Sequence, residues 1–380
     1  MANITSQRCV NCVMDTTDPN ITFDDDGLCN HCHSFSETKK DWFPNDIGKE
    51  KLASIINQVK YDGRNNEYNC ILGLSGGIDS SYLAIKIEEF GLRPLVVHVD
   101  GGWNSELAVY NIEKIVKYCN YDLQTIVIDW EEMRDLQNAY LKSGIANQDV
   151  PQDHIFFSSL YHYAVKNNIK YIFSGGNIAT ESVVVDSWHH SAMDSINLKA
   201  IHKKYGQVKL ENYKTINAFQ YYIGYPYYYK MKTVRPLNYM PYRRDAALRE
   251  LQEKVGYKDY GRKHGESVFT RFFQNYLLPE KFGYDKRLIH LSSEILSGQT
   301  TREEALNEIG KPLYDGNELT LDMRYISKKL GLEVSLLDSI CKSPGKEYWQ
   351  YNNWDFSYKI LKRIQRLVEK ILKRKLSNYS

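Results

Sequence analysis

The sequence lacks the features of a membrane-spanning or exported protein. Its 380 residues contain no apolar run long enough to cross a bilayer, and the N-terminus has no apolar signal segment. A formal net charge of +2 also gives the chain no strong overall attraction for a polyanion. These absences predict a cytoplasmic protein with no transmembrane segment and no nucleic acid as a partner.

Cysteine is scarce, and its seven positions divide into two groups. Cys70, Cys119 and Cys341 are isolated, so we expect them to be small core residues. The other four form two Cys-x-x-Cys pairs separated by sixteen residues: Cys9, Cys12, Cys29 and Cys32. Two such pairs complete a four-sulfur site with no open position. They predict a structural zinc ion, with an iron–sulfur cluster as the alternative.

Residues 69–81 are the most informative stretch, reading Asn-Cys-Ile-Leu-Gly-Leu-Ser-Gly-Gly-Ile-Asp-Ser-Ser. A short apolar strand runs into a Ser-Gly-Gly turn, and a helix opens near Asp79. Two glycines allow a close backbone approach, and serine hydroxyls and helix N–H groups would face the same point, so the turn suits a phosphate. The Gly-Lys-Ser/Thr ending of a Walker loop is absent. The alternative is an ordinary strand-to-helix turn.

Strands and helices alternate after this turn. We predict strands at 95–99, 123–128 and 171–173, separated by helices at 104–121, 131–142 and 151–168. Such alternation predicts an α/β fold with a doubly wound parallel sheet, whose ligands bind beyond the carboxyl ends of the strands.

Two further clusters follow the expected strand ends. Asp100-Gly-Gly-Trp103-Asn104 follows one strand, with Trp103 equally compatible with a buried role. Gly175-Gly176-Asn177 and Glu181 follow another, and repeat the logic of the first glycine turn. Either Glu181 or Asp79 could hold Mg²⁺, because this ion prefers oxygen ligands.

The second half of the chain is less regular. Residues 182–229 show no clear periodicity, and their tyrosines suit either sugar contacts or packing. A basic region then contains Arg235, Lys263 and His264, with Glu266 in the same stretch. Its basic side chains could stabilise a pyrophosphate leaving group or form a solvated face. The C-terminal part reads as helical. Its amphipathic segment 358–376 could contact a membrane or a partner, but we expect it to pack on the protein's own body.

With these motifs together, the chain resembles the N-acetyl sugar amidotransferases, a PP-loop ATP pyrophosphatase family (adenine nucleotide alpha hydrolase-like) of bacterial lipopolysaccharide, O-antigen and flagellar-glycan pathways. The resemblance extends from the first Cys-x-x-Cys pair to about Leu306. It implies a zinc knuckle at 1–45, a PP-loop domain at 46–240 and a helical region with a basic loop at 241–380. It also implies an AMP-forming reaction in which an adenylated acetamido group of a nucleotide-activated sugar is attacked by ammonia to give an acetamidino group.

The resemblance assigns roles by motif, with ATP, Mg²⁺ and structural Zn²⁺ as cofactors. The implied catalytic residues are Asp79, Lys263 and His264. The implied ATP-binding residues are Ser75, Gly76, Gly77, Asp79, Ser80, Ser81, Asp100, Gly175, Gly176 and Asn177. The implied substrate contacts are Trp103, Asn104, Glu181, Arg235 and Glu266.

The cysteine positions also bear on the ammonia source and on the competing functions. Residue 2 is Ala and no other cysteine lies in a glycine-rich elbow, so we expect a separate glutaminase subunit. A tRNA thiolase is the main alternative, although it needs a reactive cysteine near the nucleotide. A nucleotide-binding scaffold without activity is the other.

Overall fold

The computed structural model describes residues 7–263 and 265–372, which build a five-stranded, wholly parallel sheet. Its spatial order is β3-β2-β1-β4-β5. The strands are β1 (Cys70–Gly73), β2 (Pro94–Asp100), β3 (Asp122–Val127), β4 (Tyr171–Phe173) and β5 (Lys232–Val234). The chain steps outward from β1 through β2 to β3 and then returns to the other side of β1. The carboxyl ends of β1 and β4 therefore flank the switch point at which such sheets bind ligands.

Helices cover both faces of the sheet, which is why β1, β2 and β4 are buried along nearly their whole length. Leu72 packs with Ile85, Ile115 and Leu251 on one face, whereas Ile71 packs with Tyr140 on the other. The helices of the first face are α2 (Asp46–Asp62), α3 (Ile78–Glu89), α4 (Glu106–Cys119) and α9 (Arg244–Val255). Those of the second are α5 (Trp130–Ser143), α6 (Val150–Lys166) and α8 (Ser195–Tyr205). The predicted doubly wound α/β fold is confirmed.

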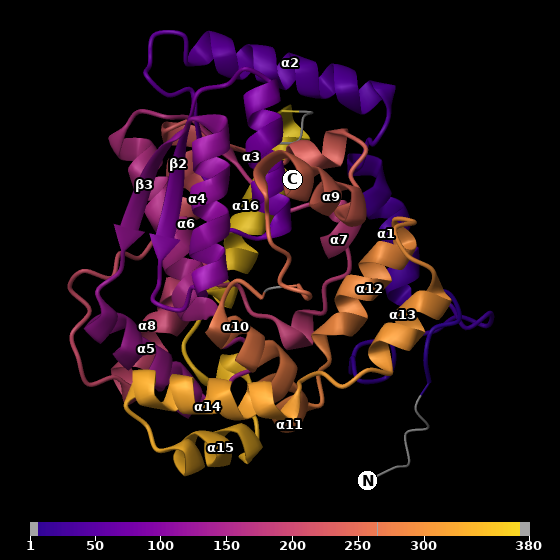
Figure 1. The fold of residues 1–380 in the computed structure, drawn as a ribbon, viewed down its shortest axis with the longest axis vertical. Helices are drawn as coiled ribbons and strands as arrows, with labels where there is room; N and C mark the ends of the chain where they lie inside the picture. Colours follow the sequence, from indigo (N-terminus) through magenta and orange to yellow (C-terminus); the bar gives the residue numbers. More distant parts are fainter. Residues whose placement is uncertain (1–6, 264, 373–380) are drawn as a thin grey trace.

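The C-terminal region is helical, as predicted, and α14 and α15 lie at the opposite end of the molecule from α2 (Figure 1). Its helices are α10 (Val268–Phe272), α11 (Leu278–Phe282), α12 (Lys286–Leu296), α13 (Arg302–Ile309), α14 (Gly316–Leu330), α15 (Val334–Lys342) and α16 (Asp355–Leu372). The remaining helical segments are α1 (Asn30–Thr38), α7 (Ile178–Glu181), η1 (Lys39–Asp41), η2 (Asp186–Trp188), η3 (Gln220–Tyr228), η4 (Pro236–Tyr239), η5 (Phe273–Leu277) and η6 (Tyr348–Gln350). The domain boundaries implied by the resemblance stay a prediction.

The structure corrects the sequence interpretation in two places. The stretch expected to be irregular contains α8 and the π-type helix η3, and the basic region after it contributes strand β5. β5 has only three residues, too few to show a periodicity. The expectation that the C-terminal amphipathic helix packs on the body is wrong for its described apolar side chains, several of which are exposed on α16. Within residues 7–263 and 265–372, no helix combines the length and apolarity needed to cross a membrane.

Candidate functional site

The Ser-Gly-Gly turn between β1 and α3 is held in shape by its own hydroxyl groups and by tyrosines. The Gly77 N–H donates to Ser75 Oγ at 3.2 Å, and Ser75 Oγ lies 3.1 Å from Ser80 Oγ. Gly76 has a φ of +86°, which a residue with a side chain rarely adopts. Its carbonyl accepts hydrogen bonds from the hydroxyls of Tyr257 and Tyr260 at 2.9 and 3.0 Å. The turn is thus fixed before any ligand binds.

The second glycine turn, after β4, packs directly on the start of α3. A Cβ atom on Gly175 would lie 2.8 Å from the Asp79 carbonyl carbon and 2.8 Å from the Ser80 nitrogen. Asn177 caps α7 by accepting from the Thr180 N–H at 3.0 Å. Only glycine at position 175 lets the two turns meet, so together they form one backbone surface beside the N-terminus of α3.

This contact gives a matched pair of variants. We expect Gly175→Ala to lower the free energy of unfolding by about 1–3 kcal/mol, because the added methyl group would collide with backbone atoms. ATP affinity should fall with it. The control is Gly176→Ala, whose Cβ would meet side-chain atoms rather than backbone: those of Glu181 and Ser174 at 3.4 Å and of Arg235 at 3.9 Å. Thermal unfolding and ATP titration calorimetry measure both effects, and equal behaviour of the two variants would contradict this account.

A cavity of about 590 Å³ opens above the two turns. It is lined by Ser75, Gly77, Asp79, Ser80, Asn104, Gly175, Gly176, Glu181, Arg235, Lys263 and Glu266, all predicted as site residues. Glu266 lies close to the first turn, since a Cβ on Gly77 would be 3.2 Å from its Oε1 atom. The structure therefore brings residues from five separated parts of the sequence around one space.

Charged groups of both signs meet near the start of α3. Tyr242 donates its hydroxyl to Asp79 Oδ1, and the Lys263 Nζ atom lies 3.3 Å from Glu181 Oε1 and 3.3 Å from His290 Nδ1. Glu294 of α12 is close enough to interact with both Asp79 and Lys263. Acidic oxygens and a basic group beside a phosphate-binding turn can hold a divalent cation and a polyphosphate together.

Burial changes the protonation of this cluster. Loss of solvent raises the pKa of Asp79, and the nearby Lys263 partly opposes that shift. Burial likewise raises the pKa of Glu294, against the attraction of Lys263 and Arg244. A carboxyl group that is costly to ionise alone is stabilised by a bound cation, so both groups fit a Mg²⁺ site.

A polar wall connects β2 with α6 on the far side of the cavity. The Asn104 amide lies 3.0 Å from His98 Nε2, and its backbone pairs with Ser267. Gln152 Nε2 and Thr270 Oγ1 each donate to Asp149 Oδ1 at 3.1 Å. Burial places the pKa of Asp149 well above its ordinary value. This wall offers hydrogen bonds to a polar ligand larger than a phosphate.

Several predicted site residues lie outside the cavity lining. Gly76, Ser81, Asp100 and Asn177 do not line it, and Asp100 accepts instead from the Gly102 N–H at 2.8 Å and the Asn104 amide at 3.1 Å. Trp103 is buried against Trp130, Phe269 and Tyr325, so its indole does not reach the cavity. The buried alternative for Trp103 is the one the structure supports. His264 lies outside the described residues.

Sequence reasoning missed part of the lining and its supports. The missed groups are Asp149, Gln152, Asp153, Phe156, Phe157, Tyr161, Tyr242, Thr270, Gln274, His290 and Glu294. Most of these residues lie on helices. A polar residue on an otherwise apolar helix face is the sequence feature that could have identified them.

The four clustered cysteines form a second candidate site, away from the cavity lining. Their sulfur atoms all lie within 4.8 Å of one another, with Cys12 Sγ 3.5 Å from Cys29 Sγ and Cys9 Sγ 3.6 Å from Cys32 Sγ. Zinc–sulfur bonds of about 2.3 Å separate tetrahedral ligands by about 3.8 Å, so the cluster fits the predicted ion. Arg302 of α13 donates to the carbonyls of Cys9 and Cys12, which joins the knuckle to the C-terminal helices.

Comparisons with known proteins agree with the motif-based resemblance. Residues 266–365 match the family model described as LPS biosynthesis protein WbpG-like, C-terminal domain. The chain is 34% identical over 87 residues to an uncharacterized protein of Methanocaldococcus jannaschii, covering 22% of this chain and 30% of that protein. It is 26% identical over 209 residues to a glutamine-hydrolyzing GMP synthase of Thermosipho africanus, covering 53% of this chain and 38% of the synthase. The chain thus spans about a third of the length of these curated relatives.

Solved structures similar to the chain include two synthetases. One is the NH3-dependent NAD synthetase of Campylobacter jejuni, at 13% identity and a TM-score of 0.33, with 69% of this chain and 97% of that one covered. The other is the NMN synthetase of Francisella tularensis, at 15% identity and a TM-score of 0.32, with 75% and 93% covered. The parallel sheet and the glycine turns define the fold here, and residues 266–365 are similar to the WbpG-like C-terminal domain.

Proposed function

We propose that this chain, whose residues 266–365 belong to the WbpG-like C-terminal domain family, is an ATP-dependent, AMP-forming amidotransferase. Its substrate would be a nucleotide-activated N-acetyl sugar of surface-polysaccharide synthesis, converted from acetamido to acetamidino. The observation that carries the proposal is the meeting of two glycine turns at one cavity, beside the Asp79, Glu181 and Lys263 charge cluster.

The reaction needs two displacements, and the lining offers groups for both. The amide oxygen of the sugar attacks the α-phosphorus of ATP, and pyrophosphate leaves. The turn amides would hold the phosphates, and Lys263 with Arg235 or Arg244 would stabilise the negative charge on pyrophosphate. Asp79 and Glu181 would hold Mg²⁺, which would neutralise polyphosphate charge.

The second displacement exchanges oxygen for nitrogen. Ammonia attacks the imidate carbon, a proton is lost from the new nitrogen, and AMP leaves with the former amide oxygen. AMP is a far better leaving group than oxide, so adenylation makes the exchange feasible. The sugar would lie along α6, where Phe156, Phe157 and Tyr161 offer apolar ring faces and Asp153 and Gln152 offer polar groups.

Ammonia would come from a separate glutaminase subunit. None of Cys70, Cys119 and Cys341 lines the cavity, and all three are buried. Burial also raises the pKa of the Cys119 and Cys341 thiols to about 12, which makes them poor nucleophiles. The same observation weighs against the tRNA thiolase alternative, since a persulfide carrier must reach the nucleotide.

The test combines the protein with ATP, Mg²⁺, ammonium and a panel of nucleotide-linked N-acetyl sugars. Mass spectrometry follows the nucleotide and the sugar together. The expected result is AMP formed in step with a sugar that is about 1 Da lighter, because NH replaces one oxygen. AMP without a changed sugar would redirect the search to another acceptor. ATP binding with no AMP, even after a glutaminase is added, would favour the scaffold alternative.

A further inference from the structure

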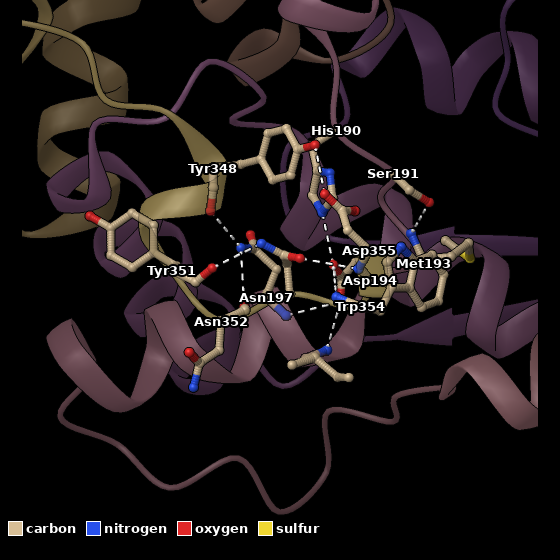
Figure 2. A network of polar contacts seen from close by, with 12 residues as sticks. His190, Ser191, Met193, Asp194, Asn197, Tyr348, Tyr351, Asn352, Trp354 and Asp355 are labelled. Atoms are coloured by element: carbon tan, nitrogen blue, oxygen red, sulfur yellow. Dashed lines mark hydrogen bonds and ion pairs between the residues drawn. The ribbon is translucent and has the colours of Figure 1, made fainter. Parts of the chain in front are cut away.

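Helix α16 leaves the body of the protein from a rigid, buried base. Asp194 of the α8 cap accepts from the backbone N–H of Trp354 at 2.9 Å and lies 2.9 Å from His190 Nε2 (Figure 2). The Asn197 side chain donates to the carbonyls of Tyr348 and Asn352, and Tyr348 donates to Asp355 (Figure 2). Because Asp194 and Trp354 are buried, the first turn of α16 has a fixed position and direction.

Beyond this base, the apolar face of α16 has little cover among the described residues. The exposed fractions are 77% for Phe356, 52% for Ile364, 62% for Leu367 and 77% for Ile371. With Ile360 they follow one another at intervals of four, four, three and four residues, so they form one stripe along the helix. Near the base of the helix, the ring of Tyr358 lies 5.5 Å from the ring of Tyr222.

The rest of the helix is strongly basic. Residues 355–372 contain five basic residues (Lys359, Lys362, Arg363, Arg366 and Lys370) and two acidic ones, Asp355 and Glu369, a difference of +3. No acidic residue lies between those two acids. An exposed apolar stripe with cationic flanks is the pattern of a helix that lies in the plane of a membrane interface. Anionic headgroups supply the complementary charge.

We propose that α16 docks this protein on an anionic lipid surface, with the stripe Phe356, Ile360, Ile364, Leu367 and Ile371 facing the acyl chains. Asp194 of the buried base is next to Met193, which lines the cavity. The orientation of α16 on the lipid would therefore set the orientation of the cavity relative to the membrane. Lipid binding by α16 does not depend on the proposed reaction.

A second copy of the chain fits this stripe less well. In a coiled coil, the positions beside the seam carry opposite charges that pair across the interface. Here the flanking residues Arg363 and Lys370 are both basic, and Glu369 is the only acid between Phe356 and Leu372, so two such helices would bring mainly like charges together.

Vesicle co-sedimentation of the full chain tests the proposal. We expect the protein to pellet with phosphatidylcholine vesicles that contain a third phosphatidylglycerol. Binding to phosphatidylcholine alone, or at 0.5 M salt, should be at least fivefold weaker. Leu367→Glu should weaken binding about tenfold or more. The matched control is Leu321→Glu on α14, because Leu321 is 64% exposed and Leu367 62%. Circular dichroism checks that both variants fold.

Each outcome decides the matter. Loss of binding in Leu367→Glu with retention in Leu321→Glu supports the proposal. Equal binding to neutral and anionic vesicles, equal loss in both variants, or no binding by the unmodified chain overturns it. Light scattering without lipid measures whether the stripe binds a second copy of the chain instead. A dimer that Leu367→Glu converts to a monomer would show that it does.

Discussion

Asp79→Asn is expected to lower the rate of AMP formation about a hundredfold to a thousandfold while the protein stays folded. The Asp79 carboxylate lies at the start of α3, beside both glycine turns, where a cation and the polyphosphate would be held. Its amide replacement keeps the shape and the Tyr242 contact but removes the negative charge. Steady-state AMP release measures the effect, and Asp245→Asn on the exposed surface of α9 is the control.

The stability of this variant separates catalysis from folding. Burial raises the pKa of Asp79 in the folded protein, so its ionisation opposes folding. That penalty is absent at low pH and grows as pH rises from the unfolded pKa through the raised folded pKa. At neutral pH without ligand, Asp79→Asn should therefore unfold at the same temperature as the unmodified protein or a higher one. A melting temperature that falls with activity would mean that Asp79 is structural.

Removal of the knuckle metal should lower the melting temperature by about 10 °C or more. Cys9, Cys12, Val13 and Met14 are buried against Leu288, Ile289 and Ala305 of the C-terminal helices, and an ion that holds four thiolates fixes this packing. Cys12→Ser should lose about one zinc per chain, measured by plasma emission spectroscopy. Activity should fall too, because α12 also carries His290 and Glu294 beside the cavity.

The matched control for this experiment is Cys119→Ser. Cys119 is also buried, in α4, but lies outside the cysteine cluster, so its variant should keep the metal. A chelated protein that unfolds at the original temperature would contradict the structural role. Iron in place of zinc would favour the cluster alternative.

The sequence predicted those parts of the site that depend on local backbone chemistry. Gly175 and Gly76 were recognisable because each follows a short apolar strand, and parallel strands bring such turns to one edge of a sheet. Tyr242 and Glu294 were not predictable in this way. Tyr242 reaches the cluster from the loop before α9 and Glu294 reaches it from α12, both more than 150 residues beyond Asp79, and no local pattern encodes that approach.

For Trp103 and the C-terminal helix, the sequence pattern was clear but did not show whether the side chains are buried. Trp103 sits among strand-end residues, yet Trp130, Phe269 and Tyr325 enclose it, because a large apolar ring gains more from packing than from a polar cavity. The periodicity of α16 predicted a helix but did not indicate what covers its apolar face. Burial depends on the positions of distant elements, which a single sequence does not specify.

The contacts between the cysteine segment and the C-terminal helices can form only late in the synthesis of the chain. Arg302 bonds to the carbonyls of Cys9 and Cys12, and Ser292 accepts from the Val13 N–H, across 279 to 293 positions of sequence. Ribosomes add about 5–20 residues each second, so these partners emerge roughly 15–60 s after the cysteines. During that interval four thiols are outside their final fold. Early capture of the metal would protect them from oxidation until the partners arrive.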